Sequence, residues 1–208
     1  GNAVGQLAMA IAAAEQLARL DRFDILETVW LRPLVLEEQA SEVSVRLAGD
    51  PERLCYEVSS SATGALVVHS KGALSVVRGE HEGEGSIQMN VDSVKVRCSQ
   101  RHTRDALYER FRGWGLGLGP YFQPFDEAWI GDDEAIASVS VHEAHRHEYD
   151  AYFLHPTLMD AALQGSGLLH LDEGNRTRVP FAADAIEFRG RVGAEGYLYV
   201  KRSGPLRF

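Results

Sequence analysis

Residues 154–169, LHPTLMDAALQGSGLL, decide the fold of this chain because they predict a buried helix that carries polar groups. Pro156 suits the first turn of such a helix, where its missing N–H has no intrahelical partner to lose. Asp160 and Gln164 then lie four residues apart on one face, among apolar neighbours. The sequence therefore predicts one acid and one amide side by side in apolar surroundings.

An acid in such surroundings is predicted to be partly desolvated, which raises its pKa. A carboxylic acid that stays protonated near neutral pH can donate a proton to a leaving hydroxyl. The Gln164 amide can hold that carboxyl in one orientation, because an amide both donates and accepts hydrogen bonds. The local pattern leaves a second interpretation open, in which Asp160 is an ordinary helix residue satisfied by a nearby donor or by solvent.

The remaining sequence predicts two α+β units. Apolar residues at helical spacing from Leu7 to Leu20 predict a buried helix, and alternation of apolar and polar residues predicts strands between residues 25 and 77. A short helix over 103–112 and a longer one over 156–169 are then predicted among strands between 128 and 201. One buried helix with antiparallel strands in each half indicates two related units.

Composition argues against several classes of function. The 208 residues include 30 acidic and 21 basic side chains, a net charge of −9, whereas nucleic-acid binding needs clustered Lys and Arg. Cys55 and Cys98 form no CxxC pattern, so neither a disulfide framework nor a zinc site is expected. The Ala-rich stretch 8–14 is too short to cross a bilayer, which takes about 20 apolar residues. We expect a cytoplasmic protein that binds neither nucleic acid nor membrane.

Two further motifs look like ligand-binding sites, but their spacing argues against that function. His142, His145 and His147 follow one another at spacings of three and two, whereas a helical zinc motif needs histidines four apart. We therefore predict a solvated loop at HEAHRHE and no metal site. The glycines of GWGLGLG, residues 113–119, follow a helical stretch and not a strand, which favours a flexible connection over a phosphate-binding loop.

Several segments resemble polyketide synthase dehydratase domains. HPTLMDAALQ, residues 155–164, matches the HPxxxDxxLQ segment of that family at every fixed position, and LGPYFQPF, residues 118–125, resembles its YGPxFQxI segment. The helix that starts at Gly1 resembles the first hot-dog helix, which follows the HxxxGxxxxP motif of the family. The sequence WLRP at residues 30–33 most resembles the trans-acyltransferase branch of the family. Three further segments resemble strands of the family and follow one another in the expected order. They are ETVWLRPLVL (27–36), VVHSKGAL (67–74) and RVPFAADAIEF (178–188).

The resemblance implies an α+β double hot-dog fold, in which two antiparallel sheets each wrap a central helix. We expect the two halves to cover residues 1–97, with the first strand missing, and residues 98–208, including the linker. It also implies removal of water from a β-hydroxyacyl thioester on the phosphopantetheine arm of an acyl carrier protein. No intrinsic cofactor and no metal are expected for that reaction. The expected partners are the acyl carrier protein, neighbouring polyketide synthase domains and a second copy in a homodimer.

The same resemblance assigns roles to individual residues. Asp160 corresponds to the acid that protonates the leaving hydroxyl, and Gln164 to the residue that positions it. Backbone N–H groups at the start of the first helix would polarise the thioester carbonyl, as a helix N-terminus favours negative charge. Contacts to the substrate are expected from His155, Gly119, Pro120, Tyr121, Phe122 and Gly1.

The sequence departs from the family pattern at two positions. No residue matches the histidine that serves as the family's base, so we expect it in a segment that precedes Gly1; the alternative is a domain that lacks it. His155 is the nearest substitute, but a residue before proline at a helix entrance is usually structural, and we expect it to play a supporting role. Leu118 replaces the tyrosine of YGPxF and removes a potential hydrogen bond to substrate. That change leaves open an enoyl isomerase, a pyran-forming cyclase or a noncatalytic branching or docking domain.

Overall fold

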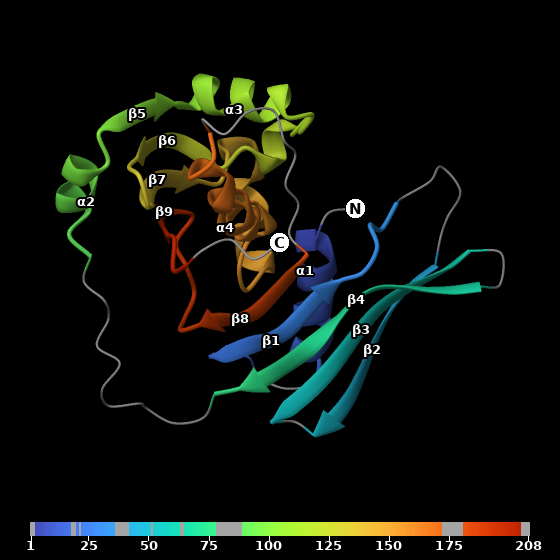
Figure 1. Cartoon of the computed structure of the whole chain (residues 1–208). Coiled ribbons are helices and arrows are strands. Elements are labelled where there is room, and N and C mark those ends of the chain that lie inside the picture. Colours follow the sequence, from blue (N-terminus) through green and yellow to red (C-terminus); the bar gives the residue numbers. More distant parts are fainter. Residues whose placement is uncertain are drawn as a thin grey trace. The chain divides into compact units, whose positions relative to one another are not determined.

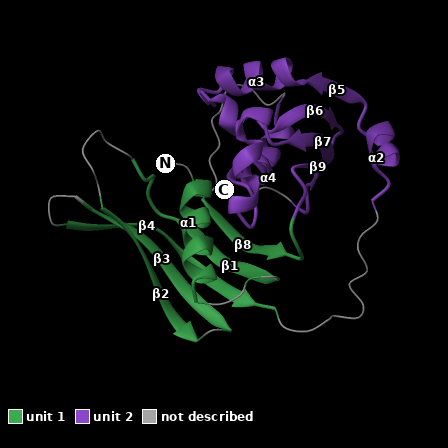
Figure 2. Cartoon of the chain, turned by 180° about the vertical axis from the view of Figure 1, so that it is seen from behind, with its two compact units in different colours: residues 1–81, 179–191 green, residues 82–178, 192–208 purple. Residues whose placement is uncertain are grey.

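The chain forms two compact units, each with one antiparallel sheet (Figures 1 and 2). The first unit comprises residues 1–81 and 179–191, and the second comprises residues 82–178 and 192–208. None of the helices formed by the described residues combines the length and the apolar character that a bilayer crossing requires. The computed structural model describes residues 3–17, 20, 22–35, 42–50, 52–62, 65–77, 89–171 and 181–204.

The first unit places one helix against a five-stranded sheet with the strand order β2-β3-β4-β1-β8. The helix, α1 (Ala3–Glu15), contacts β2, β3 and β4. It buries Leu7, Ile11 and Ala14 as the sequence predicts, but it ends at Glu15, before the predicted Leu20, and Leu17 of the predicted stripe is exposed. The strands are β1 (Phe23–Trp30), β2 (Glu42–Asp50), β3 (Arg53–Ala62), β4 (Ala65–Val76) and β8 (Ala182–Phe188).

The two units differ from the expected halves 1–97 and 98–208 in two places. Residues 82–97 lie in the second unit, and the first unit includes the late strand β8. This strand pairs antiparallel with β1, with Ile186 opposite Ile25. The rings of Phe23 and Phe188 stack at 4.5 Å between these strands. Pairing between strands so far apart in sequence is not visible in the local alternation of residues. The first unit therefore includes β8, a strand that was predicted to belong to the second half.

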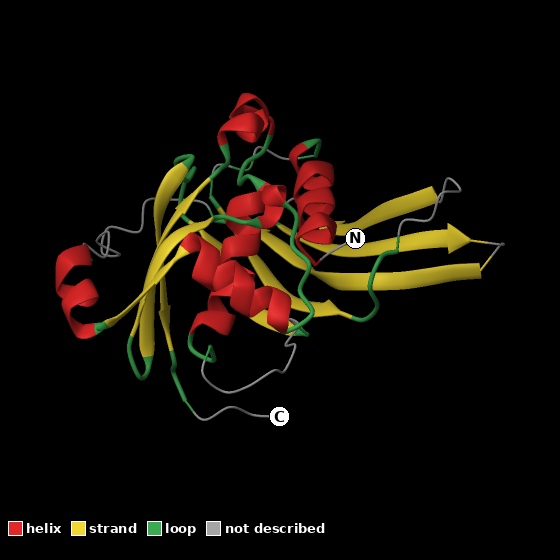
Figure 3. Ribbon diagram, turned by 90° about the horizontal axis from the view of Figure 1, so that it is seen from above, coloured by secondary structure: helices red, strands yellow, loops and turns green. Residues whose placement is uncertain are grey.

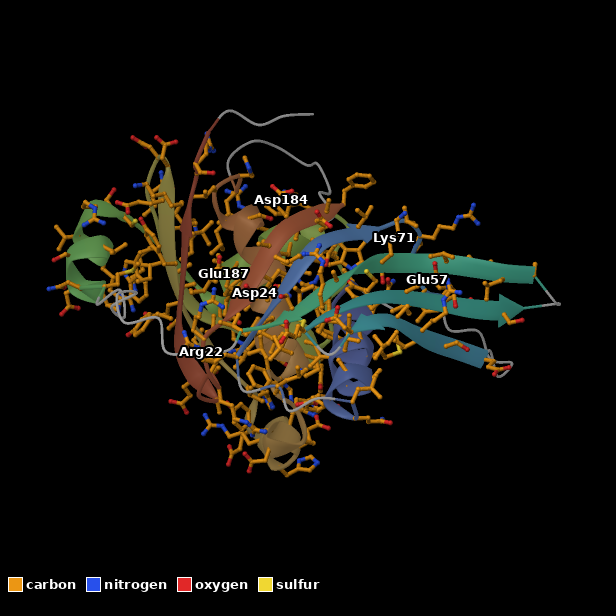
Figure 4. The ribbon with its side chains drawn as sticks, turned by 90° about the horizontal axis from the view of Figure 1, so that it is seen from below. Arg22, Asp24, Glu57, Lys71, Asp184 and Glu187 are labelled. Atoms are coloured by element: carbon orange, nitrogen blue, oxygen red, sulfur yellow. The ribbon has the colours of Figure 1, made fainter. Side chains whose placement is uncertain are left out.

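The outer surface of this sheet carries charges of both signs, as Figure 4 shows for residues of β1, β3, β4 and β8. On β1, Asp24 alternates with the buried Phe23 and Ile25, so it points away from the core. Asp24 lies opposite Glu187 in the register, and Arg189 binds their carboxylates at 2.5 and 2.7 Å. One cation thus offsets two like charges that would otherwise repel across the strand pair.

The second unit contains a four-stranded sheet, with the strand order β5-β6-β7-β9, and the long helix α4 (Pro156–Leu168). α4 contacts β6, β7 and β9 (Figure 3). A Cβ atom on Gly165 would lie 2.6 Å from Leu198 of β9, so this glycine allows the helix to approach the sheet closely. The other elements are α2 (Val91–Arg97), β5 (Gln100–Thr103), α3 (Arg104–Gly113), η1 (Pro120–Phe122), β6 (Phe125–Ile130), β7 (Glu134–Ser140), η2 (Glu143–Ala151) and β9 (Glu195–Lys201).

The histidine-rich segment is a 3-10 helix, η2, so the prediction of a loop at HEAHRHE was wrong. The His142 imidazole accepts the Ala144 N–H at 3.2 Å and caps this helix. No residue of η2 is fully buried, and therefore no apolar period marks the helix in the sequence. Among the described residues, no group of three or more His, Cys, Asp or Glu side chains could hold a metal ion.

Glu27 is strained, because it alone among the described non-glycine residues has a left-handed φ, of 54°. It lies where the pairing of β1 with β4 shifts register. Replacement by glycine should leave the free energy of unfolding unchanged or raise it by up to about 1 kcal/mol, since strain is relieved while the unfolded chain gains freedom. The lost ion pair with Arg53 is exposed and contributes little.

Urea unfolding of Glu27→Gly beside Glu57→Gly tests this expectation. Glu57 lies in the extended strand β3 of the same sheet, where glycine should cost about 1 kcal/mol. A loss of stability at position 27 as large as that at position 57 would show that the left-handed φ stores no strain.

Candidate active site

Asp160 and Gln164 face each other on α4. Asp160 is only 8% exposed. Nε2 of Gln164 donates to Oδ2 of Asp160 at 2.5 Å and to the carbonyl oxygen of Phe122 at 3.0 Å. The predicted proximity of acid and amide is therefore present. The amide also connects the helix to η1, a contact between segments 42 residues apart.

Burial raises the pKa of the Asp160 carboxyl above its ordinary value, and the hydrogen bond from Gln164 lowers it by a smaller amount. The net shift favours the protonated acid, as the apolar sequence around it predicts. Because Oδ2 accepts the Gln164 N–H, the proton of the neutral acid lies on Oδ1. When this carboxyl is protonated, its proton is therefore on the oxygen that Gln164 leaves free.

The orientation of the Gln164 side chain is fixed by the backbone. The Phe122 carbonyl can only accept a hydrogen bond, so it must face the NH₂ group of the amide. Thr157 adds a parallel contact, because its hydroxyl donates to the carbonyl of Tyr121 at 2.7 Å. Two side chains of α4 therefore bind consecutive carbonyls of η1. Thr157 was not predicted as a site residue, because it occupies a variable position of the HPxxxDxxLQ pattern.

His155 is fully buried and caps the N-terminus of α4. Its Nδ1 accepts the backbone N–H of Thr157 at 3.3 Å. A neutral imidazole that accepts through Nδ1 carries its proton on Nε2 and has no second lone pair to offer. In this arrangement His155 has no free lone pair with which to act as a general base, and its supporting role stays a prediction.

Burial lowers the pKa of His155, while the nearby Glu148 acts in the opposite direction. The unfolded chain therefore binds a proton at this histidine between pH 6.5, its ordinary pKa, and the lower folded pKa. Stability contributed by neutral His155 is present above that window and is lost as the pH falls through it. Relative to His155→Asn, which keeps a capping side chain, wild type should lose stability between pH 8 and pH 5. The loss should be about 1.4 kcal/mol for every tenfold difference in proton affinity between the unfolded and folded chains.

Denaturant unfolding of both proteins across this pH range measures the difference. A free-energy difference that is constant from pH 8 to pH 5 would contradict the buried neutral state of His155.

The other predicted contact residues gather around η1. Gly119 caps this 3-10 helix, Pro120 begins it, and both are exposed. The Tyr121 ring lies 5.4 Å from the His155 ring. Burial raises the pKa of Tyr121 to about 12, with a hydrogen bond to Tyr152 contributing in the same direction. Gly1 lies outside the described residues, so its expected contact stays a prediction.

Leu118 and Tyr108 complete the surroundings of η1. The Leu118 side chain packs against the core, where the family pattern has a tyrosine, and its carbonyl accepts Nε2 of Gln123 at 2.7 Å. Tyr108, on α3, is buried, and its hydroxyl accepts the Phe125 N–H at 2.9 Å. Tyr108 was not predicted either, because a tyrosine on an amphipathic helix has no local signal beyond packing. These bonds fix both ends of the LGPYFQPF segment.

Two family models match the chain. The first, described as polyketide synthase dehydratase N-terminal domain, matches residues 88–204. The second, described as polyketide synthase dehydratase domain, matches residues 2–61. Together they include both central helices and the segment with Asp160 and Gln164.

The chain is also similar in sequence to parts of much longer polyketide synthases. Polyketide synthase PksN of Bacillus subtilis is 28% identical over 96% of this chain, which spans only 4% of the PksN sequence. Pikromycin polyketide synthase component PikAII of Streptomyces venezuelae is 44% identical over 30% of the chain, or 2% of its own length.

Solved dehydratase structures share the fold. A trans-AT polyketide synthase dehydratase domain from Brevibacillus brevis superposes with a TM-score of 0.89 at 23% identity, covering 100% of this chain and 75% of its own. The dehydratase domain from the CurK module of curacin polyketide synthase gives 0.87 at 20% identity, covering 97% and 73%. These likenesses confirm the predicted double hot-dog fold.

Proposed function

Because this chain belongs to the polyketide synthase dehydratase family, we propose that it supplies the acid for removal of water from a β-hydroxyacyl thioester. The thioester would be carried on the phosphopantetheine arm of an acyl carrier protein. One observation carries the proposal: the buried Asp160, whose pKa is raised, is held by Gln164 at 2.5 Å. The product would be an α,β-unsaturated thioester.

The proposed reaction needs one base and one acid. A base, proposed to be a histidine outside these residues, takes the α-proton, and that electron pair forms the Cα=Cβ bond. The Cβ–O bond breaks while Oδ1 of Asp160 delivers its proton, so the hydroxyl leaves as water. The new Asp160 carboxylate keeps the hydrogen bond from Gln164, which stabilises the charge that the step creates. No metal or redox cofactor takes part in these steps.

The proposed partners follow from the relatives. The chain spans 4% of PksN, so we propose that it works beside other synthase domains and receives its substrate from a carrier protein. A homodimer is proposed on the same family resemblance. The likeness to a trans-AT dehydratase domain, at 23% identity, supports the proposed trans-acyltransferase placement.

Leu118 supports a second candidate function within the same fold. Its apolar side chain stands where the family pattern has a tyrosine hydroxyl, so one hydrogen bond to substrate is missing. This change leaves room for an enoyl isomerase or a pyran-forming cyclase, both of which conserve the mass of the substrate.

Mass spectrometry distinguishes these functions. The domain in its natural sequence context is incubated with carrier-bound 3-hydroxyacyl and 7-hydroxy-2-enoyl substrates. Loss of ~18 Da from the first substrate, the mass of water, supports dehydration. A product of unchanged mass that differs in chromatography indicates isomerisation or ring closure. An unaltered substrate in both reactions contradicts an enzymatic function and leaves a docking or branching role.

A further inference from the structure

Glu148 of η2 lies between two imidazoles. Its Oε1 is 3.4 Å from Nδ1 of His145 and 3.8 Å from Nε2 of His155. Nε2 of His155 is buried and has no hydrogen-bond partner among the described residues. Since Nδ1 of the same ring accepts the Thr157 N–H, the proton of the neutral imidazole is on Nε2 and faces Glu148.

Tyrosines surround the other sides of the His155 ring. Ring centroids of Tyr121, Tyr149 and Tyr152 lie 5.4, 6.3 and 5.4 Å from it. Tyr121 and Tyr152 are hydrogen-bonded to each other. Together with His145, these are the titratable groups that face the pair from η1, η2 and the segment before α4. Glu148 is the one carboxylate that this set brings within 4 Å of Nε2.

We propose that Glu148 is a positioning residue for the helix that carries Asp160: it accepts the His155 Nε2–H and thereby holds the imidazole as the cap of α4. The 3.8 Å separation exceeds a direct hydrogen bond, so the proposed contact requires the Glu148 side chain, which is 31% exposed, to rotate toward His155. A carboxylate on one nitrogen fixes the ring whose other nitrogen acts elsewhere, as in carboxylate–histidine pairs that orient metal ligands or catalytic bases.

The position of the cap determines the position of the acid. Asp160 lies five residues after His155 in the same buried helix, so a cap that loses its second anchor lets the first turns shift. Catalysis depends on placement within fractions of an ångström. The consequence for activity rests on the proposed function, whereas the state of the His155 ring does not.

Imidazole ¹⁵N NMR of the domain in its natural sequence context tests the pairing directly. Wild type should show His155 with a protonated Nε2 and an unprotonated Nδ1. Glu148→Gln and Glu148→Ala should lower the pKa of His155, because a nearby carboxylate favours the imidazolium. Glu143→Gln is the matched control, since it removes an exposed carboxylate from the same 3-10 helix, and it should leave the His155 titration unchanged.

Turnover of a carrier-bound substrate tests the positioning role. Glu148→Ala should lower kcat about tenfold with little change in KM, Glu148→Gln should retain more activity because its amide oxygen still accepts, and Glu143→Gln should behave as wild type. A proton on Nδ1, or a His155 titration that is the same in all four proteins, would overturn the proposal whether or not the protein dehydrates. Absence of turnover in wild type, with the NMR result as expected, would instead refute the proposed function alone.

Discussion

Asp160→Asn is expected to lower kcat for dehydration by about 10²–10⁴-fold, the contribution of a positioned general acid. The amide has the shape of the carboxyl but no acidic proton to give to the leaving hydroxyl. The free energy of unfolding, in contrast, should not fall. Because burial raises the pKa of Asp160 above its ordinary 3.8, ionisation of this group opposes folding at neutral pH, and a neutral amide removes that cost.

The pH dependence of this difference has a definite sign. Above the folded pKa both folded and unfolded Asp160 are ionised, and wild type bears the full cost of a buried charge. As the pH falls, the folded protein takes up its proton first, so the cost shrinks and vanishes below 3.8. Asp160→Asn should therefore be equal to or more stable than wild type at pH 8, with a gap that closes toward pH 4.

Turnover and denaturant unfolding of Asp160→Asn are measured beside Asp132→Asn. Asp132 is an exposed residue of the β6–β7 turn, so it makes the same Asp-to-Asn replacement outside the site. Undiminished turnover in Asp160→Asn would remove the acid from the mechanism. A loss of more than about 1 kcal/mol in its stability at pH 8 would show that the buried carboxylate is well compensated.

The central helices and the acid–amide pair were predictable because their signals are local. A 3.6-residue period marks α1, and a proline followed by acid and amide four residues apart marks α4. The apolar neighbours of Asp160 also predicted the direction of its pKa shift. Each of these inferences uses residues within two or three helical turns of one another.

The missed features depend on contacts between distant segments. β8 pairs with β1 across more than 150 residues, and the alternation of apolar and polar residues in either strand does not indicate which strand it pairs with. Thr157 and Glu148 have ordinary sequence surroundings, and their contacts to Tyr121 and His155 arise only when η1 and η2 fold against α4. The tautomer of His155 likewise follows from a backbone N–H that a sequence pattern does not display.

Gln164→Leu is expected to reduce kcat by about 10–100-fold and to raise the pKa of Asp160 further. Leucine keeps the volume of the side chain but donates no hydrogen bond, so the influence that lowers the Asp160 pKa is lost. The carbonyl of Phe122 loses its donor at the same time, which should cost about 1–3 kcal/mol of stability. Carboxyl ¹³C NMR titration, turnover and urea unfolding measure the three effects.

Gln123→Leu separates the effect on the acid from the effect on the fold. Gln123 also donates its amide to a backbone carbonyl, that of Leu118 at 2.7 Å, in the segment that Gln164 contacts. Its replacement should cost similar stability but leave the Asp160 pKa in place, since Gln123 is not among the groups that shift it. If both variants lose activity in proportion to stability and neither moves the Asp160 titration, Gln164 merely fastens η1 to α4. If only Gln164→Leu moves it, the amide sets the proton affinity of the acid, because Gln164, unlike Gln123, bonds both the carboxyl and the backbone that fixes its own orientation.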